Sequence, residues 1–315
     1  MSDSIANAIT EPCRDGFHKY VLMTAAHNEE ATIEGTIKSI ASQTILPERW
    51  VIVSDASSDK TDAIIQEYAA RFSFIHYLRM TRQPGRNFRS KVLALQSGAC
   101  LLTGCQFSFI GNVDADVSLE PTYFQDLLTH FERRPRLGLA GGFFFEKEGG
   151  VFKSRRGNQT YSVTHAAQLV RRECYEAIGG YAVLEYGGED WHAETSARMN
   201  GWEIEAFPTL KIFHHRHTGE GGNLIRYKFR QGRMDYAFGS DARFEMLKCL
   251  LRVPDKPFLI GCLARLTGYA WSSIRQDKRP VSGEFVAFMR SEQRARLAAL
   301  FKRAGNGASK GKPQF

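Results

Sequence analysis

The 315-residue chain has six cysteines but no Cys-x-x-Cys pair, so neither a zinc ribbon nor a dithiol redox site is expected. Scattered, reduced thiols are the simpler interpretation. No run of eighteen apolar residues occurs, which argues against a helix that spans a bilayer. The N-terminus, MSDSIANAITEPCRDG, is polar and lacks the apolar core of a signal peptide, so a cytoplasmic location is expected.

Two glycine motifs that bind nucleotides are also missing. No Gly-x-Gly-x-x-Gly follows the first apolar run, and no Gly-x-x-x-x-Gly-Lys-Ser/Thr occurs anywhere. A dinucleotide Rossmann domain and a P-loop are therefore disfavoured, and a nucleotide would have to be held by carboxylates and a metal. With 43% hydrophobic and 12% aromatic residues, the chain still has ample material for a folded core.

Apolar runs of strand length alternate with segments of helical periodicity in the first half of the chain. The expected strands cover residues 19–24, 50–53, 74–78 and 107–110, and the expected helices cover 31–42, 63–72 and 89–102. This order predicts an α/β fold with a Rossmann-like, mainly parallel sheet and helices on both faces. Such sheets bind ligands beyond the carboxyl ends of their strands, where the polar segments AAHNEE, SDASSDKTD and VDADV all fall.

Two pairs of carboxylates point to chemistry. Asp114 and Asp116 follow an expected strand at i and i+2, and Glu189 and Asp190 lie in YGGEDWHAE. Carboxylates at i and i+2 of an extended segment lie on one side, where they repel each other unless a cation sits between them. Mg²⁺ shares such oxygen ligands with substrate phosphates, so the first pair predicts a metal–diphosphate site. The second pair could supply the base that such a site needs.

These motifs together resemble those of family 2 glycosyltransferases, which have the GT-A fold. The family's opening Pro-Ala-x-Asn-Glu-Glu segment is similar to AAHNEEATIEGTIKSIASQ, and its Asp-Asp-Gly-Ser-x-Asp-x-Thr stretch is similar to SDASSDKTD. The Asp-x-Asp metal motif resembles VDADV, the acceptor-side segment resembles RRECYEAIGGY, and the motif with the base resembles GGEDW. The resemblance covers roughly residues 19–217 with the motifs in order, and later segments are similar to bacterial members that build cell-surface polysaccharide.

The chain departs from the family pattern at three positions. Ala25 stands where the family often has Pro, and Ser54 and Ala56 replace an Asp and a Gly. The first change is expected only to loosen a turn, whereas the loss of the Asp removes one carboxylate. Asp55 stays aligned with the residue that contacts the nucleotide base in the family.

The resemblance implies inverting transfer of a sugar from a nucleotide-sugar donor, commonly UDP-linked, to a hydroxyl of a saccharide or lipid-linked acceptor. It implies Mg²⁺ or Mn²⁺ as cofactor, held by Asp116, with Asp114 on metal or ribose. The residues that it places at the donor are Ala26, Asn28, Glu29, Asp55, Lys91 and Asp114. The base is expected to be Asp190, with Glu189 and Trp191 beside the acceptor.

Several of these residues have simpler interpretations. Asn28 and Glu29 could cap a helix, and capping is the favoured role of Asp59. Lys91 could be a solvated helix residue, although a diphosphate contact is favoured. Trp191 fits a hydrophobic core better than a sugar platform, but its place beside the base leaves stacking on an acceptor ring open.

The densest group of histidines follows an apolar run, 210–213. Some metal-dependent GT-A enzymes complete the metal coordination with a C-terminal histidine, and imidazole is an ordinary ligand for Mn²⁺-like ions. The sequence leaves two interpretations of this group open: its histidines contact a metal or a phosphate, or they lie in a surface loop with no such role. The ligand favoured by the sequence is His215, and the other members are His214 and His217.

Positive charge is concentrated in the C-terminal third. Residues 1–210 hold 21 Lys/Arg and 26 Asp/Glu, whereas residues 211–315 hold 21 and 8, a net of +13. This excess suggests an anionic partner, or else a solvated basic surface. Since the resemblance is to enzymes of polysaccharide assembly, an anionic membrane is favoured and no nucleic-acid partner is expected. The expected location is therefore cytoplasmic, peripheral on the inner face of the plasma membrane.

Helices are expected over 229–252, broken near Gly239, and over 284–303. Between them the apolar run 258–274 carries Arg265 and is too short to span a membrane. It either docks on the rest of the protein or lies in a membrane interface.

The chain is thus expected to divide into four parts: an N-terminal segment (1–18), a GT-A domain (19–222), a basic helical region (223–303) and a disordered tail (304–315). A non-catalytic module of GT-A type, which binds nucleotide or glycan within a glycan-assembly complex, is the alternative function. The presence of Asp114, Asp116 and Asp190 speaks against it.

Overall fold

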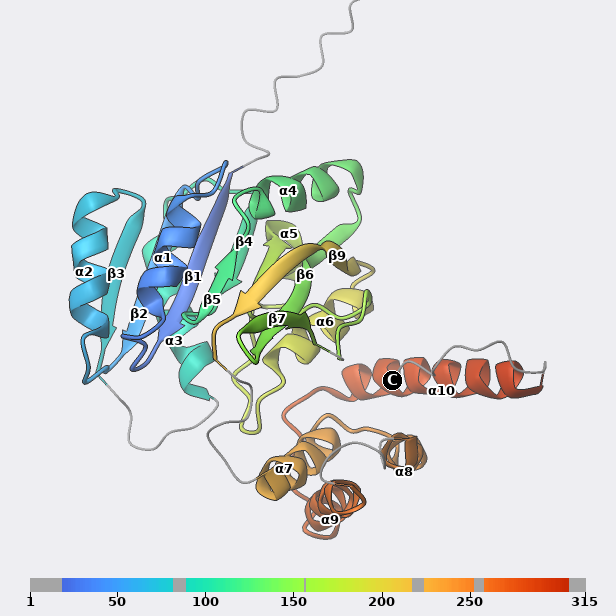
Figure 1. Cartoon of the computed structure of the whole chain (residues 1–315). Coiled ribbons are helices and arrows are strands. Elements are labelled where there is room, and N and C mark those ends of the chain that lie inside the picture. The colour runs from blue at the N-terminus through green and yellow to red at the C-terminus, as the bar shows by residue number, and fades with distance from the viewer. Residues whose placement is uncertain (1–18, 82–88, 156, 217–223, 252–257, 306–315) are drawn as a thin grey trace, which may run out of the picture.

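The computed structural model describes residues 19–81, 89–155, 157–216, 224–251 and 258–305. The expected N-terminal segment 1–18, His217 and most of the expected tail 304–315 lie outside these ranges. The described strands are β1 (Tyr20–Ala26), β2 (Arg49–Asp55), β3 (Ile75–Met80), β4 (Phe109–Val113), β5 (Val117–Leu119), β6 (Leu137–Glu148), β7 (Val151–Ser154), β8 (Ala167–Arg171) and β9 (Glu203–His214). They form one sheet in the order β3-β2-β1-β4-β8-β6-β9-β5, with β7 paired to β6 (Figure 1).

The described helices are α1 (Ile33–Ala41), α2 (Thr61–Arg71), α3 (Arg89–Ala99), α4 (Tyr123–Arg133), α5 (Arg172–Ala177), α6 (Glu189–Met199), α7 (Leu224–Ala237), α8 (Ala242–Leu251), α9 (Ile260–Ile274) and α10 (Gly283–Gly305), with a 3-10 turn at Cys100–Leu102. Each helix that the sequence predicted is present, with bounds that differ by a few residues, whereas α4, α5 and α6 were not predicted. The break expected near Gly239 falls between α7 and α8, where Gly239 has a φ of 77°. A glycine takes that left-handed conformation at low cost.

The α/β class and the GT-A architecture are confirmed. β1 pairs in parallel with β2 and β4, and β2 with β3. β1, β2 and β4 are buried almost without interruption because helices cover both faces of a parallel sheet, whereas β3 at the edge is only partly buried. Beyond β4 the pairing is mixed. β8 runs antiparallel to both β4 and β6, β6 and β9 are parallel, and β5 runs antiparallel to β9.

Successive residues of β1 and β2 supply the hydrophobic core on the two faces of the sheet. On one face Leu22 and Trp50 contact a stripe of α1 that contains Ile33, Ile37 and Ile40. On the other face Val21, Met23 and Val51 meet α3. Each aliphatic side chain buried in this way contributes about 1.5–3 kcal/mol, so the expected helical face of α1 is a main source of stability.

The C-terminal helices α7–α10 lie below the edge of the sheet at which β1 and β4 end (Figure 1). α7 and α9 cross at Gly232 and Gly268, where a β-carbon would overlap a backbone carbonyl of the other helix. Glycine at both positions therefore lets the two backbones touch. α7 is tied to the loop before α6 by a hydrogen bond of 2.6 Å, which Arg233 donates to the hydroxyl of Tyr186.

Candidate active site

Lys91, in the first turn of α3, lies among the acidic residues at the carboxyl end of the parallel strands. Its Nζ is 2.6 Å from Oδ1 of Asp114, whose backbone N–H is held by the carbonyl of Ala166. Burial alone would lower the pKa of Lys91, but the charges of Asp114, Glu189 and Asp190 outweigh it and raise the pKa. Lys91 therefore stays cationic, and the structure places both expected acidic motifs within reach of its charge.

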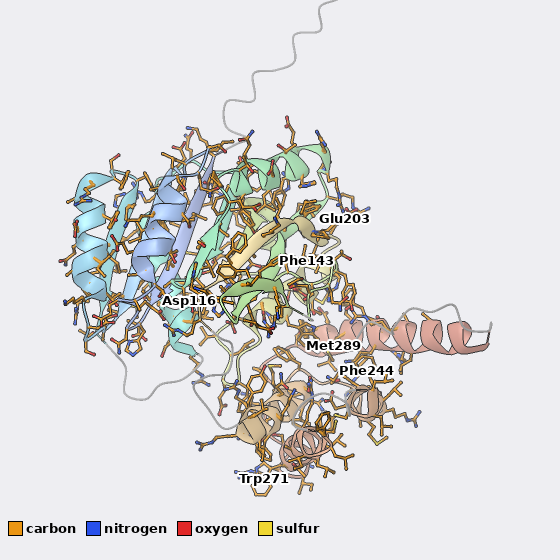
Figure 2. The ribbon with its side chains drawn as sticks, in the orientation of Figure 1. Asp116, Phe143, Glu203, Phe244, Trp271 and Met289 are labelled. Atoms are coloured by element: carbon orange, nitrogen blue, oxygen red, sulfur yellow. The ribbon has the colours of Figure 1, made fainter. Side chains whose placement is uncertain are left out.

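Asp116 lies in the turn between β4 and β5, at the lower edge of the sheet in Figure 2. Nε2 of His214 is 3.1 Å from its Oδ2, and Nε of Arg216 is 3.8 Å from the same oxygen. Burial would raise the pKa of Asp116, but the hydrogen bond and charge of His214, together with Arg216, lower it overall. The carboxylate is therefore ionised over the whole physiological range of pH.

Arg216 connects Asp116 to the loop after β1, because its guanidinium also pairs with the carboxylate of Glu29. Thr32 donates a hydrogen bond of 2.9 Å to the same carboxylate. Burial, the largest effect, raises the pKa of Glu29, while Arg216 opposes it. Two carboxylates from distant parts of the chain thus converge on one cation.

Asn28 and Glu29 hold the β1 loop against the β2 loop. The backbone N–H of Asn28 donates to Ser57, its side-chain oxygen accepts from the backbone of Ser58, and the N–H of Glu29 donates to Thr61. Neither side chain caps α1, whose N-cap residue is Thr32. The capping alternative thus does not describe them, and they shape the edge at which a nucleotide would bind.

Asp55 and Ala26 end the neighbouring strands β2 and β1, and the backbone carbonyl of Asp55 is 2.7 Å from Nδ1 of His27. Within the described residues the Asp55 carboxylate has no hydrogen-bond partner, so its oxygens are available to a ligand. Ala56 has a φ of 48°, which explains why the family favours glycine here. Asp59 accepts a hydrogen bond from the N–H of Thr61, the first residue of α2, as its capping interpretation predicted.

Glu189 and Asp190 form the first turn of α6, after Gly187 and Gly188, which have φ values of 83° and 90°. Gly188 is the N-cap residue, so neither carboxylate takes that position and both remain available. Burial is the largest effect on both groups and raises the pKa of each carboxyl. The backbone N–H of Trp191 donates to Asp190 at 2.7 Å and opposes the shift there.

Trp191 packs edge-on against Phe238, with ring centroids 4.6 Å apart, and also contacts Phe285. This small cluster joins α6 to the C-terminal helices. The hydrophobic-core interpretation therefore accounts for its position, and the expected contact with an acceptor stays a prediction.

The structure brings His214, and not the favoured His215, to the metal motif. Adjacent residues of a strand point to opposite faces, and β9 ends with His214 on the side of Asp116. The ring of His215 is instead 2.8 Å from the hydroxyl of Ser118. Nδ1 of His214 has no partner within the described residues.

Sequence reasoning also missed His165 and Arg216. His165 is buried, both its ring nitrogens lack partners within the described residues, and its Nδ1 is 3.9 Å from Glu189. Burial lowers its pKa well below the usual value, so the ring is neutral. No motif signals His165, whereas Arg216 stands in the histidine segment and was available as a candidate.

The donor groups at Asp116 fit a divalent metal. A carboxylate and an imidazole lie in hydrogen-bond contact, and an oxygen–nitrogen pair of this kind leaves the other coordination positions to a diphosphate. Across the described parts of the chain, no three His, Cys, Asp or Glu side chains are placed to hold an ion by themselves. A metal here would thus depend on ligands from the substrate.

Comparison with known proteins places the chain in a family. A family model described as "Glycosyl transferase family 2" matches residues 22–186, just over half of the chain. The chain therefore belongs to glycosyl transferase family 2 and is a glycosyltransferase. A comparison with curated proteins finds no match.

Solved structures of the GT-A type support the fold. The mannosyltransferase PcManGT from Pyrobaculum calidifontis, in complex with GDP-Man and Mn²⁺, is similar with a TM-score of 0.52 and 16% identity, over 90% of this chain and 82% of that one. TarS 1–349 from S. aureus, in complex with UDP-GlcNAc, gives 0.53 and 14% over 91% and 87%. GalNAc-T7 with UDP, GalNAc and Mn²⁺ gives 0.57 and 14% over 89% and 57%.

Proposed function

We propose that the chain moves a sugar from a nucleotide-sugar donor, UDP-linked, to a hydroxyl of a saccharide or lipid-linked acceptor in polysaccharide biosynthesis, with inversion and with Mg²⁺ or Mn²⁺ as cofactor. The similar structures solved with GDP-Man, UDP-GlcNAc and Mn²⁺ support a nucleotide-sugar donor and a divalent metal. The observation that carries the proposal is that Lys91 pairs with Asp114 at the carboxyl ends of the parallel strands, where the charges of Glu189 and Asp190 also raise its pKa.

The donor would lie along this edge. Ala26 and Asp55 end adjacent strands and line the nucleoside end, while Lys91 offers a cation to the diphosphate. Asp116 and His214 would hold the metal, which when bound neutralises the charge that develops on the leaving diphosphate. Glu29 and Arg216 keep the metal motif next to the nucleotide loops.

The transfer itself is a single displacement. The acceptor oxygen attacks the anomeric carbon, the bond from that carbon to the diphosphate oxygen breaks, and its electron pair leaves with the nucleoside diphosphate. Asp190 takes the proton of the acceptor hydroxyl. A carboxylate with a raised pKa is a stronger base than a solvated one, and burial gives Asp190 that property. Attack opposite the leaving group inverts the anomeric carbon.

The test is hydrolysis and transfer of a panel of sugar nucleotides with Mg²⁺ or Mn²⁺, with the anomeric configuration of the product followed by NMR. One donor should be consumed only with metal, and Asp116→Asn should lose both turnover and metal-dependent binding of nucleoside diphosphate in calorimetry. Asp126→Asn on α4, at the opposite end of the sheet, is the matched control and should behave like the parent. Unchanged affinity in Asp116→Asn would remove the metal role.

The alternative, a non-catalytic nucleotide- or glycan-binding module, makes a different prediction in the same panel. It binds a nucleotide sugar in calorimetry but consumes none of them, with or without metal. Asp114, Asp116 and Asp190, the carboxylates that the chemistry needs, are all present. Among the described residues Asp114 pairs with Lys91 and Asp116 with His214, both of which belong to the proposed site. For this reason the catalytic proposal is preferred.

A further inference from the structure

Large exposed apolar side chains gather on the C-terminal helices. Seventeen such residues are exposed within the described parts of the chain, and twelve of them fall between residues 224 and 274. They are Leu224, Ile225, Tyr227, Met246, Leu250, Leu251, Phe258, Leu259, Ile260, Leu263, Trp271 and Ile274. Single exposed apolar residues are ordinary, but a set that gathers on neighbouring elements marks an interaction surface.

α9 is the centre of this surface and is built the opposite way from a surface helix of a soluble protein. A stripe of its exposed residues, here named the α9 face, consists of Ile260, Leu263, Thr267, Trp271 and Ile274, with Ile274 83% exposed; Ala270 and Ser273 are exposed beside it. The hydroxyl of Thr267 donates back to the carbonyls of Leu263 and Ala264, so it presents no unsatisfied polar group. The α9 face carries no charge.

The single charged residue of α9 points inward. Nε of Arg265 is 2.9 Å from Asp235 of α7 and 2.7 Å from Glu245 of α8, and Lys248 of α8 pairs with the same two carboxylates. The charged groups of this cluster thus lie inside the α7–α9 unit, whereas the α9 face outside is largely apolar. Removal of such a face from water is favourable.

Basic residues border the α9 face. Arg275 follows the helix, and its guanidinium lies over the ring of Trp271 at 5.7 Å from the centroid, while Lys278, three residues further on, is exposed. A tryptophan beside an arginine suits the boundary between lipid tails and headgroups, where an apolar ring and a cation are both satisfied. Figure 2 shows Trp271 at the outer edge of the helices, on the side away from the sheet.

We propose that the α9 face docks on a lipid bilayer that contains anionic headgroups, at the cytoplasmic surface of the membrane. Within the described residues no helix is long and apolar enough to cross a membrane, so the helix would lie in the interface. A second copy of the chain is the other candidate occupant. Two such faces would, however, bring together like charges from regions that each carry a net of +13. An anionic bilayer complements both the apolar face and its basic border.

Docking in this orientation also suits the active site. The carboxyl ends of the parallel strands face α7–α9, so the site lies on the membrane side of the sheet (Figure 1). A lipid-linked acceptor would then reach Asp190 from the bilayer. The docking face itself does not depend on the proposed transfer reaction, because vesicle binding is measured without substrate.

The experiment is co-sedimentation of the full chain with vesicles of phosphatidylglycerol and phosphatidylcholine, compared with phosphatidylcholine alone. Leu263→Gln/Ile274→Gln should weaken binding to the anionic vesicles about tenfold or more, because it removes apolar surface from the lipid contact. Leu46→Gln/Leu101→Gln, which changes two exposed leucines of the catalytic domain, is the matched control and should bind like the parent. Melting curves establish that both double variants are folded.

Two further measurements separate the possible occupants. Trp271 emission should shift to shorter wavelength on anionic vesicles, and Trp271→Phe should remove the shift while the protein still binds. Binding to anionic vesicles should be weaker in 1 M salt, where the Debye length is about 3 Å, than in 0.1 M salt, where it is about 10 Å.

The proposal is overturned if the parent ignores anionic vesicles, or if Leu263→Gln/Ile274→Gln binds them equally well. It is also overturned if the parent is a dimer in sedimentation velocity, the double variant is a monomer and neither binds lipid. Equal binding to neutral vesicles would overturn the role of the basic border.

Discussion

Arg265→Met tests the ionic interior of the C-terminal helices most directly. The Arg265 side chain is 8% exposed and its partners Asp235 and Glu245 are 12% and 1% exposed, so the pair contacts are shielded from water. Removal of the guanidinium leaves two buried carboxylates that share only Lys248. Loss of one partner from such a cluster typically costs about 3–5 kcal/mol, since an uncompensated charge stays buried. At roughly 2 °C per kcal/mol, the melting temperature should fall by about 6–10 °C.

The assay is thermal and urea unfolding at pH 7, with Glu245→Gln/Arg265→Met as the second arm. The double variant restores a balanced cluster of one acid and one base, so it should recover part of the loss. Burial and the charge of Asp235 raise the pKa of Glu245, and a carboxyl with a raised pKa favours the folded state as it takes up a proton. The penalty of Arg265→Met should therefore shrink as the pH falls through that raised pKa. The ionic cluster would be refuted as a source of stability if Arg265→Met lowered the free energy of unfolding by less than about 1 kcal/mol, or if the double variant were no more stable than Arg265→Met.

Asp190→Asn should keep donor binding, measured by calorimetry, and lower turnover by roughly 10²-fold or more, as loss of a general base does; parent-like turnover at saturation would rule it out as the base. Because burial raises the pKa of Asp190, turnover of the parent should fall on the acid side at a higher pH than a solvated aspartate would give, and a pH profile without that displacement would contradict the assignment. Gly268→Val should lower the melting temperature while the exposed change Gly35→Ala should not, because only the first β-carbon meets a backbone carbonyl.

Local patterns of the sequence were enough to predict the first half of the fold. The four parallel strands and three helices up to β4 have strong periodicity, and their turns are polar where ligands bind. The pairing of β5, β6, β8 and β9 was not predicted, since it joins segments that lie far apart in the sequence. Mixed pairing in that half depends on those contacts and not on the composition of any one strand.

At the site, the sequence predicted which residues take part better than it predicted which way their side chains point. Asp114, Asp116 and Asp190 stand in short motifs, and the structure brings the first and third to Lys91. The choice between His214 and His215 depends on the register of β9 against β5, where His214 pairs with Val117. A shift of one residue exchanges the two faces of a strand, and no local signal fixes that register.

The apolar run 258–274 illustrates the same limit for a helix. From the sequence, Arg265 interrupts the run and lowers its apparent affinity for lipid. In the structure that charge faces the α7–α9 interior, so the surface that α9 presents to solvent is uncharged and largely apolar. The partners Asp235 and Glu245 lie on other helices, and only their positions reveal which way the arginine points.

The glycine contact between α7 and α9 connects the loop before α6, which is bonded to α7, to the outermost helix. Gly232 and Gly268 leave no space between the two backbones, so the helices can only move as one body. Arg233 of α7 donates a hydrogen bond to the hydroxyl of Tyr186, which lies four residues before Asp190 in the chain. A tilt of α9 would therefore be transmitted, through one backbone contact and one hydrogen bond, to the loop that precedes Asp190, the proposed base.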